Sequence, residues 1–246
     1  MAALSARELL TAWERGHGRT PLEMGLTMLQ CLQPEDGANN PAELSIGERD
    51  RLLIGLRERI FGPLLNAFAV CPGCGESLEF RLMTSNLLEQ CAHAEAGQAR
   101  MLDIAAGDYR VSIRCPTSAD LIAAAEAESP DSGRDILLER CVQSATRGGV
   151  ALESGKIPEE IIAELEERLA AADPGGEVRL NLVCPACRFA WTAEFDIATY
   201  LYAEISALAR QLLEEVGILA AAYGWSEEDI LAMPRLRRCF YLDRAR

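Results

Sequence analysis

Apolar residues recur every three or four positions over much of this chain, which is the spacing of amphipathic helices. In the N-terminal part it predicts helices over 5–13, from Pro21 onward and over 46–68, the last kinked or split at Gly62 and Pro63. The longest repeat follows Asp196 and continues to about Tyr223. Its apolar steps of four and three average about 3.67 residues per turn, so we expect one long helix with a nearly straight apolar stripe.

Alternation of apolar and polar residues replaces this spacing in four short stretches and predicts β-strands there. These stretches are residues 78–82, 109–114, 178–183 and 189–195. The first, third and fourth flank short turns, so we expect them to form hairpins. We expect the strand at 109–114 to pair with the first of these hairpins.

Helical spacing returns between the second and third of these strands. It predicts helices over 118–128 (capped by Ser118), over 132–146 and from Pro158 to the Asp173–Gly176 turn. The predicted class is therefore α+β and mostly helical, with a helical lobe inserted between two hairpins. The expected regions are an N-terminal helical region at 1–70, a first hairpin region at 71–114, the lobe at 115–176, a second hairpin at 177–196 and C-terminal helices with a basic tail at 197–246.

Both expected hairpins carry a pair of cysteines two residues apart: Cys71 and Cys74 in the first, Cys184 and Cys187 in the second. A CxxC turn directs two sulfurs at one point, and two such turns complete a tetrahedral Cys₄ shell, the usual structural zinc site. Arg188 stands where the first turn has Gly75, which makes the second turn less ideal. We therefore expect a split zinc ribbon that binds Zn²⁺ through these four cysteines.

Two other uses of the same cysteines remain open. A redox-active CxxC is normally a single copy near a βαβ pattern, and a second matching copy has no role there. Iron in a rubredoxin-like site takes the same four thiolates. Catalytic zinc fits poorly, because four thiolates leave no position for water or substrate. Cys91 and His93 are too close in sequence for a usual zinc half-site, and we interpret them as loop residues.

Composition limits the class of protein further. The chain has 246 residues and a net charge of −14, with no apolar run of the roughly 18–20 residues needed to span a bilayer. Its N-terminus lacks the order of a signal peptide, and five further single cysteines suit a reducing compartment, so we expect a cytoplasmic protein. A nucleic-acid surface needs clustered Lys and Arg, but Lys156 is the sole lysine and the one basic cluster is the arginine-rich tail.

The residues needed for catalysis are also scarce. Both histidines lie in poor contexts for a Ser-His-Asp or Cys-His site, and there is no phosphate-binding Gly-rich loop and no dinucleotide fingerprint. Paired acids such as Glu159–Glu160 and Glu214–Glu215 lie on expected helices, where a solvated face explains them. The residues favour a non-enzymatic binding protein or adaptor.

Several motifs in a fixed order give a sharper indication. They are GERDRLL at 47–53, LRERIFGP at 56–63, CPGCGE at 71–76, PTSADL at 116–121, LLERC at 137–141, CPAC at 184–187, FDI at 195–197 and YGWSE at 223–227. Together they resemble the zinc-ribbon proteins of phage-tail-like contractile injection systems, which are similar to the baseplate hub assembly chaperones of T-even-like phages.

The resemblance implies a cytoplasmic, non-catalytic protein that binds a hub or spike component and helps it to enter the baseplate. The helical lobe and the basic, aromatic tail are the surfaces expected to bind the partner. The alternative is a zinc-ribbon regulator or nucleic-acid-associated adaptor, which the acidic charge disfavours.

Overall fold

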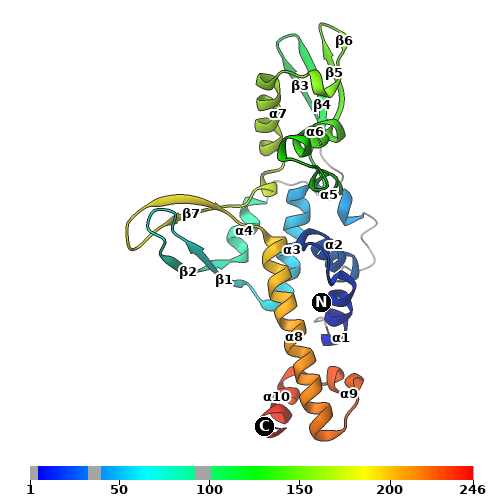
Figure 1. Cartoon of the computed structure of the whole chain (residues 1–246), viewed down its shortest axis with the longest axis vertical. Helices are drawn as coiled ribbons and strands as arrows, with labels where there is room; N and C mark the ends of the chain where they lie inside the picture. Colours follow the sequence, from blue (N-terminus) through cyan, green and yellow to red (C-terminus); the bar gives the residue numbers. More distant parts are fainter. Residues whose placement is uncertain (1–4, 33–39, 92–100, 246) are drawn as a thin grey trace. The chain divides into compact units, whose positions relative to one another are not determined.

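The computed structural model describes residues 5–32, 40–91 and 101–245. These residues divide into two compact units. The helical unit consists of 5–32, Arg59–Gly62 and 196–245, and the sheet unit of the described residues in 40–58 and 63–195. The class is α+β, with many helices, three small sheets and a long helix near the C-terminal end (Figure 1).

The helical unit contains five complete helices among its described residues. They are α1 (Ala6–Gly16), α2 (Pro21–Leu32), α8 (Ile197–Tyr223), α9 (Glu227–Ala232) and α10 (Arg235–Ala245). Ser5 and Glu8 form a capping box that starts α1, and Asp196 accepts hydrogen bonds from the N–H groups of Ala198 and Thr199 to start α8. Gly224, with φ of 69°, ends α8 in the left-handed region.

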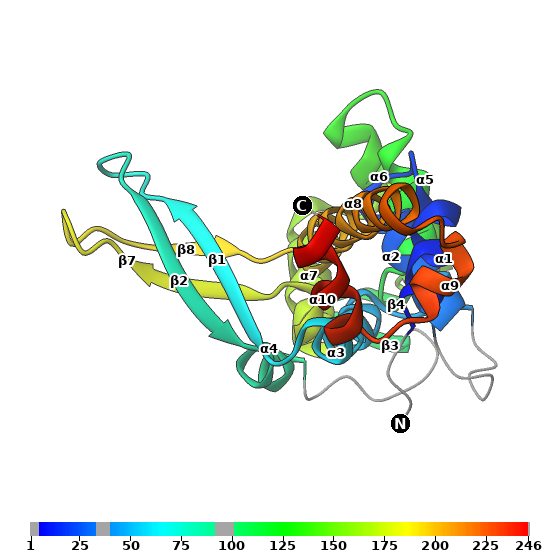
Figure 2. The same cartoon turned by 90° about the horizontal axis from the view of Figure 1, so that it is seen from below.

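Helix α8 confirms the long helix that the apolar stripe predicts. Its buried Ala209 and Leu212 form a core with Leu9 and Leu10 of α1 and Leu231 of α9. Trp13 of α1 also donates from Nε1 to Ser206 Oγ at 3.4 Å. Figure 2 shows α1, α9 and α10 gathered around α8.

The sheet unit begins with a short 3₁₀ helix, η1 (Pro41–Glu43), and with α3 (Ile46–Phe61), whose last residues belong to the helical unit. Two hairpins follow at widely separated places in the sequence, β1 (Leu64–Val70) with β2 (Ser77–Met83) and β7 (Arg179–Val183) with β8 (Ala190–Glu194). We call these the knuckle hairpins. Helix α4 (Thr84–Gln90) follows β2 directly.

The chain between the knuckle hairpins forms a four-stranded antiparallel sheet with helices beside it. Its strands are β3 (Met101–Ala106), β4 (Tyr109–Arg114), β5 (Val142–Arg147) and β6 (Val150–Ala151), in that order. Its helical segments are α5 (Ser118–Ala125), α6 (Pro130–Cys141), η2 (Ser154–Lys156), α7 (Glu159–Ala172) and η3 (Pro174–Gly176). Ile113 of β4 packs in one buried cluster with Ile162 and Leu165 of α7, which lies beside the sheet (Figure 1).

Two of the predicted helices end earlier than expected, although the break expected at Gly62 and Pro63 is confirmed. The helix expected over 46–68 ends at Phe61, because Gly62 has φ of 88° and Pro63 follows it, and the apolar residues after Pro63 form strand β1. The region expected to be helical up to residue 70 thus ends in a strand. The helix expected over 132–146 ends at Cys141, since Val142–Arg147 pairs with β4 as strand β5.

Strand β4, predicted at 109–114, does not pair with a knuckle hairpin. Its neighbours are β3 and β5, with Ile104 opposite Val111 and Val111 opposite Ala145. The segment expected to be a purely helical lobe therefore contributes β5 and β6 to a sheet that starts before it.

Candidate metal centre

The first knuckle hairpin presents Cys71 and Cys74 on a tight turn between β1 and β2. The Cys71 N–H donates to the Glu76 carbonyl at 2.9 Å, and the Gly75 N–H donates to the Cys71 carbonyl at 2.8 Å. The second bond requires the chain to reverse at Gly75, whose φ is 77°. Glycine has no Cβ to oppose this conformation, which explains its place after the second cysteine.

The second knuckle hairpin repeats this backbone arrangement with a different residue at the critical position. The Cys184 N–H donates to the Phe189 carbonyl at 2.9 Å, and the Arg188 N–H donates to the Cys184 carbonyl, also at 2.9 Å. Arg188 has φ of 62° and is the one non-glycine residue with positive φ in the described part of the chain. The two turns therefore have the same backbone hydrogen bonds, although the Cβ of Arg188 disfavours the left-handed conformation that this position requires.

The fold brings all four predicted cysteines together. Their sulfur atoms lie within 4.8 Å of one another, with 3.6 Å between Cys71 and Cys187 and 3.7 Å between Cys74 and Cys184. Four sulfurs at the usual zinc distance of about 2.3 Å in a tetrahedron are separated by about 3.8 Å. The sequence predicted this cluster, and the observed spacing is compatible with a metal ion at its centre.

The burial and the electrostatics of the cluster are uneven. Cys71 and Cys184 are buried, whereas Cys74 and Cys187 are exposed. The backbone N–H groups of Cys187 and Ala186, together with the neighbouring thiols, lower the pKa of Cys184 to about 7. The Glu76 N–H acts in the same direction on Cys74, but the surrounding thiols outweigh it and raise the pKa of Cys74 to about 12. Cys184 is therefore the thiol that ionises readily. A bound cation would be needed to stabilise several thiolates side by side.

The remaining cysteines lie outside this cluster. Cys31 and Cys239 are partly exposed, while Cys91, Cys115 and Cys141 are buried. Burial raises the pKa of both Cys91 and Cys141 to about 11, which keeps these thiols protonated and unreactive. His93, which we interpreted with Cys91 as a loop residue, falls outside the described residues.

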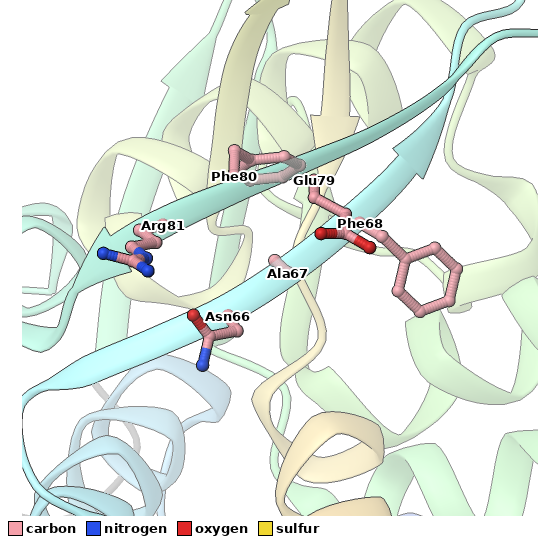
Figure 3. Close-up of a pocket in the computed structure, with 6 residues that line it drawn as sticks. All are labelled: Asn66, Ala67, Phe68, Glu79, Phe80 and Arg81. Carbon is pink, nitrogen blue, oxygen red and sulfur yellow. The ribbon is translucent and has the colours of Figure 1, made fainter.

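The first knuckle hairpin also has a hollow of about 440 Å³ on its surface, shown in Figure 3. Asn66 of β1 lies opposite Arg81 of β2, and Phe68 lies opposite Glu79. Phe68 is 78% exposed and projects from the strand, as Figure 3 shows. One carboxylate and one guanidinium on an open surface can contact a partner, but they do not form an acid–base pair around an enclosed substrate.

Sequence reasoning missed a buried charged network next to the four-stranded sheet. The Asp120 carboxylate is fully buried and accepts hydrogen bonds from Arg114 Nη2 at 2.9 Å, from Arg140 Nε at 2.7 Å and from the Thr117 N–H at 2.9 Å. Thr117, not Ser118, caps α5. The threonine followed three residues later by an aspartate is the capping-box signal that could have found this pair.

A second buried network occupies the start of α3, within the GERDRLL motif. Glu48 accepts two hydrogen bonds from Arg51, at 2.7 and 2.9 Å, and Arg49 pairs with Asp50 at 2.6 Å. Glu48, Arg49 and Asp50 are all buried. No sequence pattern distinguishes such charges from a solvated helix face, because their partners are set by the tertiary fold. In both networks the buried carboxylates are compensated by neighbouring arginines.

Helices that could cross a bilayer are absent from the described part of the chain: none is both long and apolar enough. Comparison with known proteins identifies a family for the chain. A family model described as T4 bacteriophage base plate protein matches residues 5–192, a range that includes all four clustered cysteines. Searches of curated proteins and of solved structures returned no significant match. Because the family model covers more than half of the sequence, the chain belongs to the T4 bacteriophage base plate protein family.

Proposed function

We propose that this protein is a non-enzymatic assembly chaperone or adaptor that delivers a hub or spike component to the baseplate of a phage tail or a phage-tail-like contractile injection system. The observation that carries the proposal is the family match over residues 5–192. Membership of a baseplate family implies contact with other baseplate proteins. The chaperone role, the hub or spike partner and the cytoplasmic location are the parts that we add, on the strength of the ordered motifs from GERDRLL to YGWSE.

We also propose that Cys71, Cys74, Cys184 and Cys187 hold a structural Zn²⁺. Four thiolates are the donor set of a closed zinc site, and the sulfur separations of 3.6 and 3.7 Å suit tetrahedral coordination. The ion would supply a cross-link between two hairpins that are more than 100 residues apart in sequence. The residues themselves provide two preshaped turns, so little backbone change is required for binding.

Metal analysis of the purified protein tests the zinc proposal. We expect about one zinc ion per chain and no visible absorbance. Iron in the same site would give thiolate-to-iron charge-transfer bands in the visible range. A metal-free protein with an unchanged fold would contradict the structural role.

Co-purification tests the assembly role. The tagged full-length chain is expressed with the hub, spike and other baseplate proteins of its own particle, and captured proteins are identified by mass spectrometry. We expect a hub or spike protein in the eluate. Finished particles are then analysed for the chain, because a chaperone leaves the particle and an adaptor stays. RNA polymerase subunits or nucleic acid in place of baseplate proteins would instead favour the alternative function, a zinc-ribbon regulator or nucleic-acid-associated adaptor.

A further inference from the structure

The helical unit contains a groove that the assembly role does not yet use. It has a volume of about 520 Å³ and is lined by α1, α8, the α9–α10 segment and the last turn of α3. Its floor is apolar: Leu9, Leu212 and Leu231 are buried there. Ile60 and Leu208 also line the groove and are only half-buried, so the apolar surface continues into the opening.

A buried ion pair fixes one wall of this groove. Arg238 of α10 donates from Nε to Glu215 Oε2 of α8 at 2.6 Å, and from Nη1 to the Met233 carbonyl at 3.3 Å. The other oxygen of Glu215 accepts from Gln211 at 2.8 Å. Because both partners of the pair are buried and compensated, the wall is preformed and adds no net charge to the groove.

Two other arginines on the lining differ from Arg238. Arg59 and Arg235 are exposed, and neither forms an ion pair with any residue that the structure describes. Many other arginines of this acidic chain are paired, among them Arg7 with Glu228 and Arg134 with Glu159. The groove therefore combines an apolar floor with two unpaired positive charges, on a chain whose net charge is −14.

We propose that this groove is a docking site for an amphipathic, acidic segment of a baseplate protein, whose apolar side chains enter the groove and whose carboxylates pair with Arg59 and Arg235. This inference rests on the assembly role proposed above and names the surface and the chemistry of the partner. Charge complementarity selects carboxylates, and the apolar floor selects a protein segment over a phosphate backbone. Most of the groove comes from α8–α10, beyond the matched residues 5–192, so family membership does not assign it.

Charge reversal tests the two arginines against a matched control. The Arg59→Glu/Arg235→Glu double variant, and Arg235→Glu alone, are compared with Arg237→Glu, which reverses one charge on the helix of Arg235 but outside the groove lining. We expect the captured hub or spike protein to bind the double variant about 100-fold more weakly, and Arg237→Glu within about threefold of the unchanged protein. Circular dichroism and zinc content confirm that all three variants fold.

Equal loss in the double variant and in Arg237→Glu would overturn the groove as the site and leave the assembly role intact. If the unchanged chain captures no baseplate protein at all, both proposals fail. Once the partner segment is mapped, exchanging its acidic residues for arginine restores binding to the double variant if the groove is the site.

Cross-linking provides a second readout that does not depend on affinity. A photo-reactive phenylalanine analogue replaces Leu208 in the groove or, as control, Leu213, an exposed leucine of the same helix outside the lining. We expect the Leu208 probe to cross-link an acidic, apolar segment of the captured baseplate protein and the Leu213 probe to give no such product. Cross-links to nucleic acid or to a second copy of this chain, or none from Leu208 in the assembled complex, would overturn the proposal.

Discussion

The knuckle hairpins and the four-stranded sheet are both built from short antiparallel strands, but they are stabilised in different ways. Among the four strands of the knuckle hairpins, Leu65 is the single buried residue. The sheet instead buries side chains from three of its strands, including Ile104, Val111 and Ala145, in one cluster with α7. The sheet therefore has a hydrophobic core of its own, and the hairpins have almost none.

This difference shows why the cysteines lie where they do. A two-stranded hairpin is marginally stable in water at best, whereas strands that pack an apolar face against a helix support themselves. Hairpins with so little buried surface would gain most from a cross-link, and the zinc site proposed above would provide one between them. The sheet needs no metal, and its polar reinforcement is the Asp120 network.

The largest expected effect is loss of the metal cross-link proposed above. Replacing Cys184 by serine removes a buried thiol that would be a ligand of the proposed zinc, and structural zinc contributes on the order of 10 kcal/mol to the folding of small zinc domains. We expect zinc to be lost and the amides of β7 and β8 to exchange at nearly unprotected rates. The amides of β4 should keep their protection, because the sheet has its own core.

Cys239→Ser is the matched control for this change, since Cys239 lies outside the cluster and is partly exposed. Hydrogen exchange measured by mass spectrometry, together with zinc content, separates the two variants. Equal exchange in β4 and in β7–β8 after zinc loss would show that the two regions are one cooperative structure, contrary to the comparison.

The next prediction is the converse: it weakens the four-stranded sheet and leaves the knuckle hairpins intact. In Asp120→Asn, Arg114 and Arg140 lose their charged partner, and removing one member of a buried ion pair costs several kcal/mol. Because Arg140 is 43% exposed and regains water, we expect a smaller loss of about 2 kcal/mol. Zinc content should be unchanged. Urea unfolding measures the loss, and a zinc-deficient variant would contradict the independence of the two regions.

Acid should remove the same contribution in the unchanged protein. Burial by itself raises the pKa of Asp120, but Arg114, the Thr117 N–H and Arg140 outweigh it and hold this pKa well below its usual value of 3.8. A lowered folded-state pKa stabilises the protein above pH 3.8, and this stabilisation declines as the pH falls toward the folded-state value. The difference in unfolding free energy between the unchanged protein and Asp120→Asn should therefore shrink between pH 6 and pH 3.

A smaller effect compares an apolar residue in each region. Ile113→Val removes one buried methylene from the core of the sheet and should cost about 1 kcal/mol. Phe68→Ser, at a side chain that is 78% exposed, should change stability by less than about 0.5 kcal/mol. Thermal and urea unfolding measure the change in the free energy of unfolding for both variants. A larger cost at Phe68 would mean that this side chain is covered in the purified protein.

The smallest effect concerns the one difference between the two turns. The left-handed conformation costs a non-glycine residue about 1–2 kcal/mol. Glycine avoids this cost, but it loses more backbone entropy on folding, which offsets part of the gain. Arg188→Gly should therefore strengthen zinc binding by about 0.5 kcal/mol, or about twofold, in a competition with a chelator. Gly75→Arg should weaken it several-fold. Weaker binding by Arg188→Gly would show that the arginine side chain has a contact worth more than the strain.

The residues around the thiol cluster could be predicted from sequence because their geometry is local. A CxxC turn needs only its own backbone hydrogen bonds, and those of Cys71 and Cys184 follow the same pattern. Helix α8 could be predicted for a similar reason, since one apolar stripe runs along most of this 27-residue helix. Short-range periodicity contains the necessary information in both cases.

Strands β1 and β5 could not be predicted in this way. Each follows a helix with little change in apolar spacing, and each becomes a strand because a distant segment pairs with it, β2 in one case and β4 in the other. The pairing of β4 was also wrong, since strand β3 was not recognised as its partner. Register and burial of this kind depend on contacts that sequence periodicity does not contain.

The separation of 110 residues between Cys74 and Cys184 also means that the two cysteine pairs are synthesised at different times. At a synthesis rate of about 5–20 residues per second, the first pair of cysteines leaves the ribosome roughly 5–20 seconds before the second. During this interval the early pair has no partner, and its thiols are open to oxidation or to a passing metal ion. The intervening sheet has time to fold first, so the cysteine cluster is completed only when two turns made at different times meet.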